Sequence, residues 1–426
     1  MNFEYKEKAL NWQGADLTRL CAEISQELQN TYAYSGPYFL YHEGVLKERL
    51  EKLVNGLPSH CRYYYSVKSL SNISVLKKIA AYPSFGLDVV SGGEILRGIL
   101  AGYKGEQMVF AGVGKTEKEI VLGLQKNIRS FHVESLSEMR KIARTAISLG
   151  KVANVALRVN PDIEVDTHKY ITTGKEENKF GISAREIDEA LEIIKESASL
   201  KLVGLQCHFG SQILDARPYR KALDFLIAMA KDVESKLGVK PEYLSLGGGF
   251  GIDYTTPNGN AKEFPIEELN KALADYDGLP YELCFEPGRF ISAYSGILVT
   301  RILYIKEKTD FSIAICNAGI SELIRPALYG SEHPILPLER KEGADKTYDY
   351  VGPICESTDF IQMKVDTHPV EEGDEVAVLH SGAYAAVMSS NYNTRALAPE
   401  IITDGKSFKI IRKPQQVSEL LNLEDV

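Results

Sequence analysis

Residues 85–101 read FGLDVVSGGEILRGILA, a strand-like segment followed by a helix-like one. The first part, 85–89, is a short apolar run of the kind that forms a buried β-strand. The second part, 92–101, has apolar residues at helical spacing and predicts an amphipathic α-helix. The stretch therefore predicts one βα unit, the building block of a parallel sheet.

The same order of strand and helix recurs from about residue 37 to residue 287. Further helices are expected at 71–80, 136–149 and 219–237. The expected strands are 38–41, 62–67, 85–89, 107–111, 130–133, 155–159, 202–208, 243–246 and 282–286. About eight such units predict an α/β protein with a (β/α)8 TIM-like barrel. An open doubly wound sheet is the alternative, but it usually has fewer strands in one array.

The rhythm changes after about residue 290, where short β-like segments separated by Gly, Pro and Asp follow one another. These segments, 312–316, 348–351, 375–379 and 408–412, predict a separate C-terminal β domain, a β-barrel or sandwich. We therefore expect a barrel domain at 37–290 and a β domain at 291–426. Residues 1–36 belong to no βα unit and are expected to pack on the β domain.

Composition narrows the class of protein. The chain has 426 residues, of which 44% are hydrophobic and 25% charged, as in ordinary globular proteins. Its net charge of −9 repels nucleic acid and anionic membranes. The first residues lack the apolar core of a signal peptide, and we expect a cytoplasmic protein. The six cysteines form no C-x-x-C pair, so neither a metal site nor disulfides are indicated, and most should be buried thiols.

Lys68 follows the Tyr-rich strand 62–67. A lysine after a strand is usually a solvated loop residue. At the mouth of an apolar barrel, however, it stands where a Schiff-base amine would be placed, with a pKa lowered by desolvation.

A run of glycines, Gly247-Gly248-Gly249, follows the strand 243–246. Its backbone N–H groups can form a concave anion site for a phosphate. The run fails the dinucleotide fingerprint, which needs a glycine at Ile252. Gly114-Lys115-Thr116 resembles a P-loop, but Val109 stands where that motif needs its first glycine, so a βα turn is expected there.

Other polar side chains follow other strands of the expected barrel. Glu286 and Arg289 flank a Pro-Gly turn, and His208 and Ser211 follow the strand 202–208. Each has an ordinary interpretation as a surface ion pair or a structural histidine. Their position favours a functional interpretation, because active sites of such barrels lie at the carboxyl ends of the strands. No G-x-S-x-G elbow and no H-E-x-x-H motif is present, so hydrolase classes lack support.

These motifs, with Cys-Glu-Ser at 355–357 and Gly-Ala-Tyr at 382–384, occur in an order that resembles a known family. The chain is similar to the fold-type III, alanine-racemase-like pyridoxal-phosphate decarboxylases, and most closely to the diaminopimelate decarboxylases among them. The resemblance runs from about residue 36 to 412. Longer matches support it at 86–94, from Thr167-His168 to Gly181, at 324–329 and at 388–393.

The resemblance implies a role for each matching residue. Lys68 would form the Schiff base with pyridoxal 5′-phosphate, His208 would stack on its ring, and Glu286 would pair with the ring nitrogen. The phosphate would be held by Ser211, Gly248, Gly249, Gly288 and Tyr384, the last also near the substrate. Arg289, Arg325 and Tyr329 would bind the far carboxylate of the substrate. Glu356 would bind the ammonium group beside that carboxylate. Cys355 would donate a proton. In the family Cys355 and Glu356 reach the partner's site, which implies a homodimer.

An acidic partner at the ring nitrogen favours decarboxylation, because it deepens the electron sink of the cofactor. A racemase would favour a weaker partner there. The resemblance therefore implies decarboxylation of meso-diaminopimelate to L-lysine. Three residues depart from the family pattern: Leu70, Ser245 and Phe290. A related decarboxylase of specialised metabolism is the first alternative, and a non-catalytic pyridoxal-phosphate carrier the second, although such carriers resemble the barrel alone.

Overall fold

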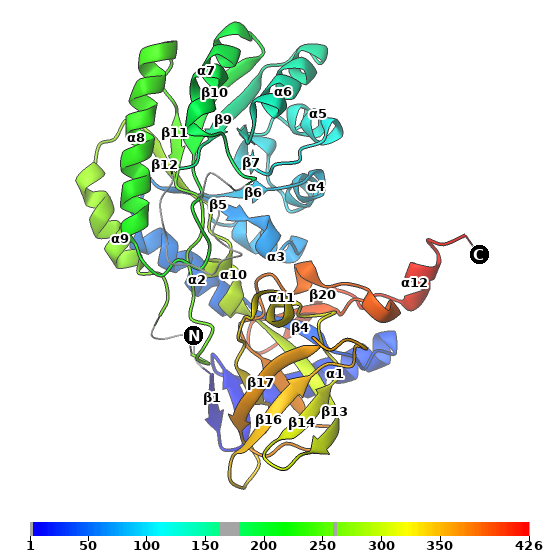
Figure 1. Cartoon of the computed structure of the whole chain (residues 1–426). Coiled ribbons are helices and arrows are strands. Elements are labelled where there is room, and N and C mark those ends of the chain that lie inside the picture. Colours follow the sequence, from blue (N-terminus) through cyan, green and yellow to red (C-terminus); the bar gives the residue numbers. More distant parts are fainter. Residues whose placement is uncertain (1–2, 162–178, 259–261, 426) are drawn as a thin grey trace. The chain divides into compact units, whose positions relative to one another are not determined.

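A computed structural model describes residues 3–161, 179–258 and 262–425, which form two compact units (Figure 1). The barrel unit comprises Leu50–Gly251 and Glu263–Phe290. The β unit comprises Met1–Arg49, Ile252–Lys262 and Ile291–Val426. The sequence match at Thr167 and His168 lies outside the described residues.

The barrel unit is built on a closed parallel barrel, which has eight strands in the described part of the chain. The strands follow sequence order, and the barrel closes where β12 pairs with β5, with Phe285 beside Tyr63. The predicted (β/α)8 fold is confirmed. The strands are β5 Arg62–Ser66, β6 Phe85–Val89, β7 Met108–Phe110, β8 Ser130–Val133, β9 Ala153–Arg158, β10 Leu200–Gln206, β11 Tyr243–Ser245 and β12 Glu282–Phe285.

Helices lie outside these strands (Figure 1). They are α2 Glu43–Gly56, α3 Ile73–Ile79, α4 Gly92–Leu100, α5 Glu117–Gln125, α6 Leu136–Ser148, α7 Ile187–Glu196, α8 Arg217–Leu237 and α9 Ile266–Leu273. Helix α5 begins at a capping box of Thr116 and Glu119, and the buried Lys115 amine donates to Glu138 at 2.7 Å. The segment 114–116 is therefore a βα turn, as predicted. No helix in the described ranges is long and apolar enough to cross a membrane.

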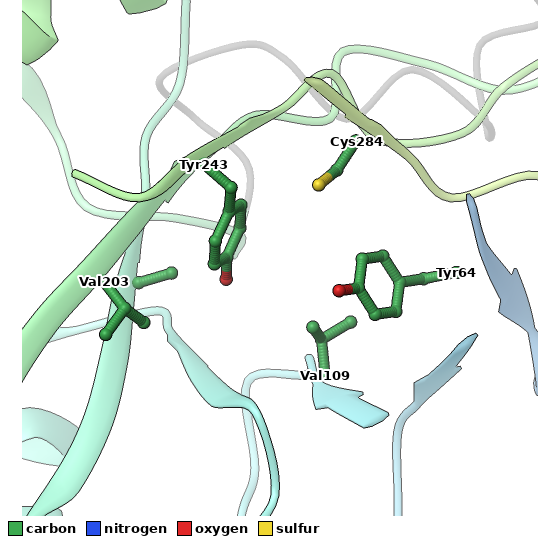
Figure 2. Packing of buried hydrophobic residues seen from close by; sticks show 6 residues of the cluster. Tyr64, Val109, Val203, Tyr243 and Cys284 are labelled. Atoms are coloured by element: carbon green, nitrogen blue, oxygen red, sulfur yellow. The ribbon is translucent and has the colours of Figure 1, made fainter. Parts of the chain in front are cut away.

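The barrel interior is filled by side chains rather than left as a pore. Tyr64, Val109, Ala156 and Tyr243 belong to one buried cluster and come from alternate strands, as in the layers typical of this fold (Figure 2). Two tyrosines in one layer need space from their neighbours. A Cβ added to Gly204 on β10 would lie 2.4 Å from the Tyr243 ring, so the glycine makes room for the phenol.

The β unit contains a large mixed sheet, which has nine strands among the described residues. Its longest strand, β13, pairs with β4, β14 and β18. The N-terminal strands form a separate small sheet, and Thr18 at the start of α1 donates to the Leu338 carbonyl at 2.6 Å. The elements are β1 Phe3–Lys6, β2 Ala9–Trp12, β3 Ala15–Asp16, α1 Leu17–Tyr32, β4 Tyr38–His42, α10 Arg289–Ser292, β13 Gly296–Glu307, β14 Ser312–Cys316, α11 Arg325–Tyr329, β15 Ile335–Pro337, β16 Lys346–Val351, β17 Phe360–Thr367, β18 Glu375–Val378, β19 Glu400–Thr403, β20 Phe408–Arg412 and α12 Val417–Leu421.

One strand assignment was wrong. The segment 38–41 was expected to start the barrel, but β4 pairs antiparallel with β13 and parallel with β19 in the β unit. The barrel unit accordingly begins near Leu50 rather than at residue 37. All five residues of β4 are buried, and such a run fits the middle of any sheet. Its sequence therefore does not reveal which sheet it joins.

Candidate active site

The predicted cofactor residues of the barrel unit follow different strands at their carboxyl ends. Lys68 follows β5, His208 follows β10, Gly248 follows β11, and Glu286 follows β12 directly. In a closed parallel barrel these ends form one rim. The fold therefore brings together side chains that are up to 218 positions apart in the sequence, from 68 to 286.

Lys68 lies in a short 3-10 turn, Val67–Ser69, directly after β5. Its Nζ is 3.3 Å from Oδ2 of Asp88, a carboxylate with only 1% of its side chain exposed. The Ser66 hydroxyl donates to the same oxygen at 2.8 Å. About half of the lysine side chain is buried, since 44% of it remains exposed. The amine is thus oriented by a buried anion and still accessible from solvent.

Both carboxylate oxygens of Glu286 accept hydrogen bonds. Glu286 is buried, and Gln206 donates to its Oε2 at 2.9 Å while Ser245 donates to its Oε1 at 2.7 Å. Burial and then the nearby Asp88 anion raise the pKa of Glu286 to about 7, against the opposing effects of the Ser245 hydrogen bond and the Lys68 cation. The Glu286 carboxyl therefore gains or loses its proton near neutral pH.

The His208 ring is fixed by the glycine run. The Gly248 N–H donates to Nδ1 at 3.2 Å, so this nitrogen carries no proton and Nε2 is the protonated one in the neutral ring. Burial, followed by the Arg158 and Lys68 cations, holds the pKa of His208 well below its usual range. The imidazole is therefore a neutral, flat surface with a defined orientation.

The glycine run approaches its neighbours more closely than other residues could. Gly247 and Gly249 have φ values of +67° and +105°, which side chains rarely adopt. A Cβ on Gly248 would lie 2.2 Å from the Glu286 carbonyl oxygen. At the same rim Arg289 donates to the Ser211 hydroxyl at 3.0 Å. Gly288 packs against the turn that carries Lys68, because a Cβ there would lie 3.1 Å from Cβ of Ser69.

Arg325, Tyr329, Cys355, Glu356 and Tyr384 belong to the β unit. Arg325 is buried at the start of α11, and Tyr329 ends that helix, half-buried. Glu356 is exposed, and its carboxylate accepts from the Ser357 N–H at 2.8 Å. Tyr384 has a φ of +55°, a strained value for a tyrosine that is typical of functional sites.

Cys355 differs from the other cysteines. The other five are buried, as predicted for small apolar residues, whereas Cys355 is exposed. Its N–H donates to the Asn393 side chain at 3.1 Å. The adjacent Ile354 N–H donates to the buried Asp359 carboxylate at 2.5 Å. The loop therefore has a fixed backbone that presents a thiol to solvent.

Comparison with known proteins matches residues 43–293 to a family described as pyridoxal-dependent decarboxylase, pyridoxal binding domain. The chain is 37% identical to diaminopimelate decarboxylase of Aquifex aeolicus over 96% of its length and 94% of that protein. It is also 37% identical to the Haemophilus influenzae enzyme, covering 95% and 97%. The chain belongs to the diaminopimelate decarboxylase family. A solved relative is diaminopimelate decarboxylase from Helicobacter pylori complexed with L-lysine, with a TM-score of 0.85 and 34% identity over 93% of this chain and 98% of that one.

The residues of the rim fit the cofactor of this decarboxylase family, pyridoxal 5′-phosphate. That molecule has an aldehyde, a basic ring nitrogen, an aromatic face and a phosphate. The rim offers in turn the Lys68 amine, the buried Glu286 carboxylate, the neutral His208 ring, and a backbone run whose glycines leave no room for side chains. The donor set therefore matches each chemical part of the cofactor.

Several residues that contact the predicted site residues of either unit were not anticipated from the sequence. Asp88 and Gln206 lie within strands and resemble ordinary polar residues there, although each contacts a key side chain. His333 accepts from the Arg325 guanidinium at 2.8 Å, and Asp359 anchors the cysteine loop. Two signals were available: Asp88 lies within the family match at 86–94, and Ser245, which departs from the family pattern, donates to Glu286.

Proposed function

We propose that this chain decarboxylates meso-2,6-diaminopimelate to L-lysine and CO2, the last step of lysine biosynthesis, as a cytoplasmic homodimer. The observation that carries the proposal is Glu286, a buried carboxylate placed at the end of a barrel strand and held by Ser245 and Gln206. The small polar substrate and the net charge of −9 support a cytoplasmic enzyme without nucleic-acid or membrane partners.

Glu286 is proposed to set the electronics of the reaction. When bound, pyridoxal phosphate supplies an electron sink for the pair left by the departing carboxylate. A carboxylate beside the ring nitrogen keeps that nitrogen protonated and so favours loss of CO2. Ser245 and Gln206 orient both oxygens of Glu286 for this task.

The other rim residues bind and orient. Lys68 is the amine that would hold the cofactor aldehyde, and Asp88 would position it through the contact at 3.3 Å. His208 would pack its neutral ring on the aromatic face, in the orientation that Gly248 fixes. Ser211, Gly248, Gly249, Gly288 and Tyr384 are proposed to hold the phosphate, mainly through N–H and O–H donors.

Substrate choice is proposed to depend on charge matching. Arg289, Arg325 and Tyr329 supply two cations and a hydroxyl for a distal carboxylate, and Glu356 faces the ammonium beside it. A second amino-acid head satisfies both demands. Lysine or ornithine would leave a buried cation without its partner, which costs several kcal/mol.

Cys355 is proposed to donate the proton that replaces CO2, and with Glu356 to enter the site of the partner subunit. Its exposure supports this role, because a structural cysteine would be buried like the other five. The loop 352–358 would then complete the site only in a homodimer.

The departures from the family pattern give no support to the alternative substrates. Leu70 is buried, and its carbonyl accepts from the Tyr65 hydroxyl at 3.1 Å. Phe290 is buried edge-to-face on Phe250, 6.1 Å away. Both residues pack the barrel unit, and Ser245 supports Glu286.

Steady-state turnover of meso-diaminopimelate beside L-lysine, L-ornithine and L-arginine tests the proposal, with CO2 release as the readout. We expect turnover of diaminopimelate to exceed the others by at least about a hundredfold, because a site built to bind a group rejects analogues that lack it. Equal turnover of lysine or ornithine would refute the substrate assignment. Absence of CO2 release from all four would favour a non-catalytic carrier.

A further inference from the structure

Three buried polar side chains line up in the barrel interior beneath Glu286 and have no part in the mechanism above. We call His132, Tyr243 and Ser130 the polar triplet. The Tyr243 hydroxyl lies 3.0 Å from Nε2 of His132 and 2.6 Å from the Ser130 hydroxyl. All three side chains are completely buried. His132 and Ser130 are two positions apart on β8 and therefore point to the same face.

The other ring nitrogen of His132 faces Glu286. Nδ1 is buried and has no hydrogen-bond partner in the described structure, and Oε1 of Glu286 lies 3.7 Å away. That separation is longer than a hydrogen bond. A buried polar nitrogen without a partner costs about 1–3 kcal/mol, and catalytic hydrogen bonds tighten when an active site is loaded. Glu286 is therefore the acceptor toward which Nδ1 is placed.

His132 is neutral, because burial, and then the Lys115 and Arg158 cations, hold its pKa well below the usual range. A neutral imidazole has one N–H, so the triplet has two proton arrangements. If Tyr243 donates to Nε2, the proton lies on Nδ1 and is directed at an ionised Glu286. If Nε2 donates to Tyr243, Nδ1 presents a lone pair that only a protonated Glu286 can satisfy.

We propose that His132 is a positioning residue for Glu286: Tyr243 donates to Nε2, and Nδ1–H donates to the Glu286 carboxylate in the cofactor-loaded enzyme. Ser130 in turn donates to the Tyr243 oxygen. The polar triplet thereby keeps Glu286 ionised beside the protonated ring nitrogen. This inference rests on the proposed function only in taking Glu286 as the partner of that nitrogen.

Other groups also act on Glu286 and belong to other strands of the barrel. Asp88 on β6 is an anion that disfavours ionisation, while Lys68 after β5 and Arg158 on β9 are cations that favour it. Ser245 on β11 and Gln206 on β10 are neutral donors. His132 differs from all of these, because its single ring proton lies on either Nδ1 or Nε2, so Nδ1 can donate to Glu286 only when Nε2 accepts from Tyr243. Its tautomer is therefore coupled to the protonation of Glu286.

Three substitutions separate the two nitrogens of His132. In His132→Asn the amide nitrogen occupies the position of Nδ1, so the donor toward Glu286 is kept. In His132→Gln the amide reaches the position of Nε2, so only the contact toward Tyr243 is kept. His132→Leu removes both. Each protein is loaded with pyridoxal phosphate labelled with 15N in its ring, and the 15N chemical shift then reports protonation of the ring nitrogen without any turnover.

We expect the wild type and His132→Asn to keep the ring nitrogen protonated near neutral pH. In His132→Leu and His132→Gln the equilibrium should move about tenfold to a hundredfold toward the proton on Glu286, as expected for loss of a hydrogen bond to a charged group. The value of kcat should be lower in His132→Leu and His132→Gln than in the wild type and His132→Asn, with little change in KM. An unchanged 15N shift in His132→Leu, or equal shifts in the Asn and Gln variants, would overturn the proposal.

Separate control experiments distinguish a folding defect from a change at Glu286. Thermal unfolding of each variant shows whether the barrel is intact. If His132→Leu does not fold, Tyr243→Phe removes only the hydroxyl that fixes the tautomer, and its 15N shift should lie between those of the wild type and His132→Gln; a wild-type shift would overturn the proposal. Wild-type protein that shows the expected 15N pattern but does not turn over diaminopimelate contradicts the substrate assignment and leaves the role of His132 standing.

Discussion

The buried Glu286 carboxyl should make the stability of the cofactor-free protein depend on pH. Its pKa is raised from 4.5 to about 7 by burial and by Asp88. For an acid, a raised pKa in the folded state means that the stability due to the bound proton is present below pH 4.5 and is lost as pH rises through about 7. We therefore expect cofactor-free protein to lose about 3 kcal/mol of stability at this site between those pH values.

Urea denaturation of the cofactor-free wild type and of Glu286→Gln at pH 5 and pH 8 measures this effect. The glutamine variant should be the more stable protein at pH 8, and the difference should shrink at pH 5. Glu94, whose pKa is raised to about 7 by burial, titrates in the same range in both proteins and cancels in the comparison. A difference that is independent of pH would contradict the assignment of the proton to Glu286.

Arg325 is the residue on which substrate choice should depend. His333 donates from Nδ1 to the Leu379 carbonyl at 2.8 Å, so its Nε2 accepts from Arg325. The guanidinium also lies over the Tyr254 ring, 4.4 Å from its centre. Lysine cannot reproduce both contacts, because it lacks the planar fork.

We therefore expect Arg325→Lys and Arg325→Ala to lower kcat/KM for diaminopimelate by about tenfold to a hundredfold, with little change in cofactor affinity. Arg301→Ala is the matched control, since that arginine of the same unit pairs with Glu375 and is 42% exposed. If cofactor affinity falls in parallel with kcat/KM, Arg325 has a structural role instead.

Among single residues, the polar side chains and glycines at strand ends could be located from the sequence, because position and residue type both mark them. Lys68, Glu286 and the glycine run are of this kind. Their supports could not be predicted, because Asp88, Gln206 and His132 resemble ordinary strand residues. The closed barrel brings β6, β8, β10 and β12 around one interior, and only there do these side chains lie close to Lys68 and Glu286.

At the scale of elements, a glycine in a strand is explained by its neighbour. A Cβ on Gly204 would lie 2.4 Å from the Tyr243 ring, inside a fully buried layer. Gly204→Ala should therefore destabilise the protein by about 1–3 kcal/mol, as overpacking does. Gly114→Ala is the control, because nothing lies within 4 Å of its Cβ position. Thermal unfolding compares the two, and equal melting temperatures would contradict this packing.

Elements with a clear period could be predicted, and so could the pairing of the barrel strands, whereas the sheet that β4 joins could not. The strands 85–89, 130–133, 312–316 and 408–412 agree with β6, β8, β14 and β20. Strand β4 was placed in the wrong sheet, because its fully buried residues fit the centre of either. Strand β13, which joins three other strands, was not predicted, since its apolar first half and polar second half lack one period.

At the scale of the whole molecule, Lys68 belongs to the barrel unit and Cys355 to the β unit, and this division leads to the last prediction. If each site takes Lys68 from one subunit and Cys355 from its partner, then Lys68→Ala and Cys355→Ala homodimers are each inactive. A mixed dimer has one site with both defects and one site with neither. After random exchange half of the dimers are mixed, so activity should return to about a quarter of that of the wild type.

Subunit exchange is followed by mass spectrometry of two differently tagged chains. Mixing with a doubly substituted Lys68→Ala, Cys355→Ala chain is the control and should restore nothing. Exchange without recovery would mean that one chain supplies both residues, and the exposed thiol of Cys355 would then need another explanation.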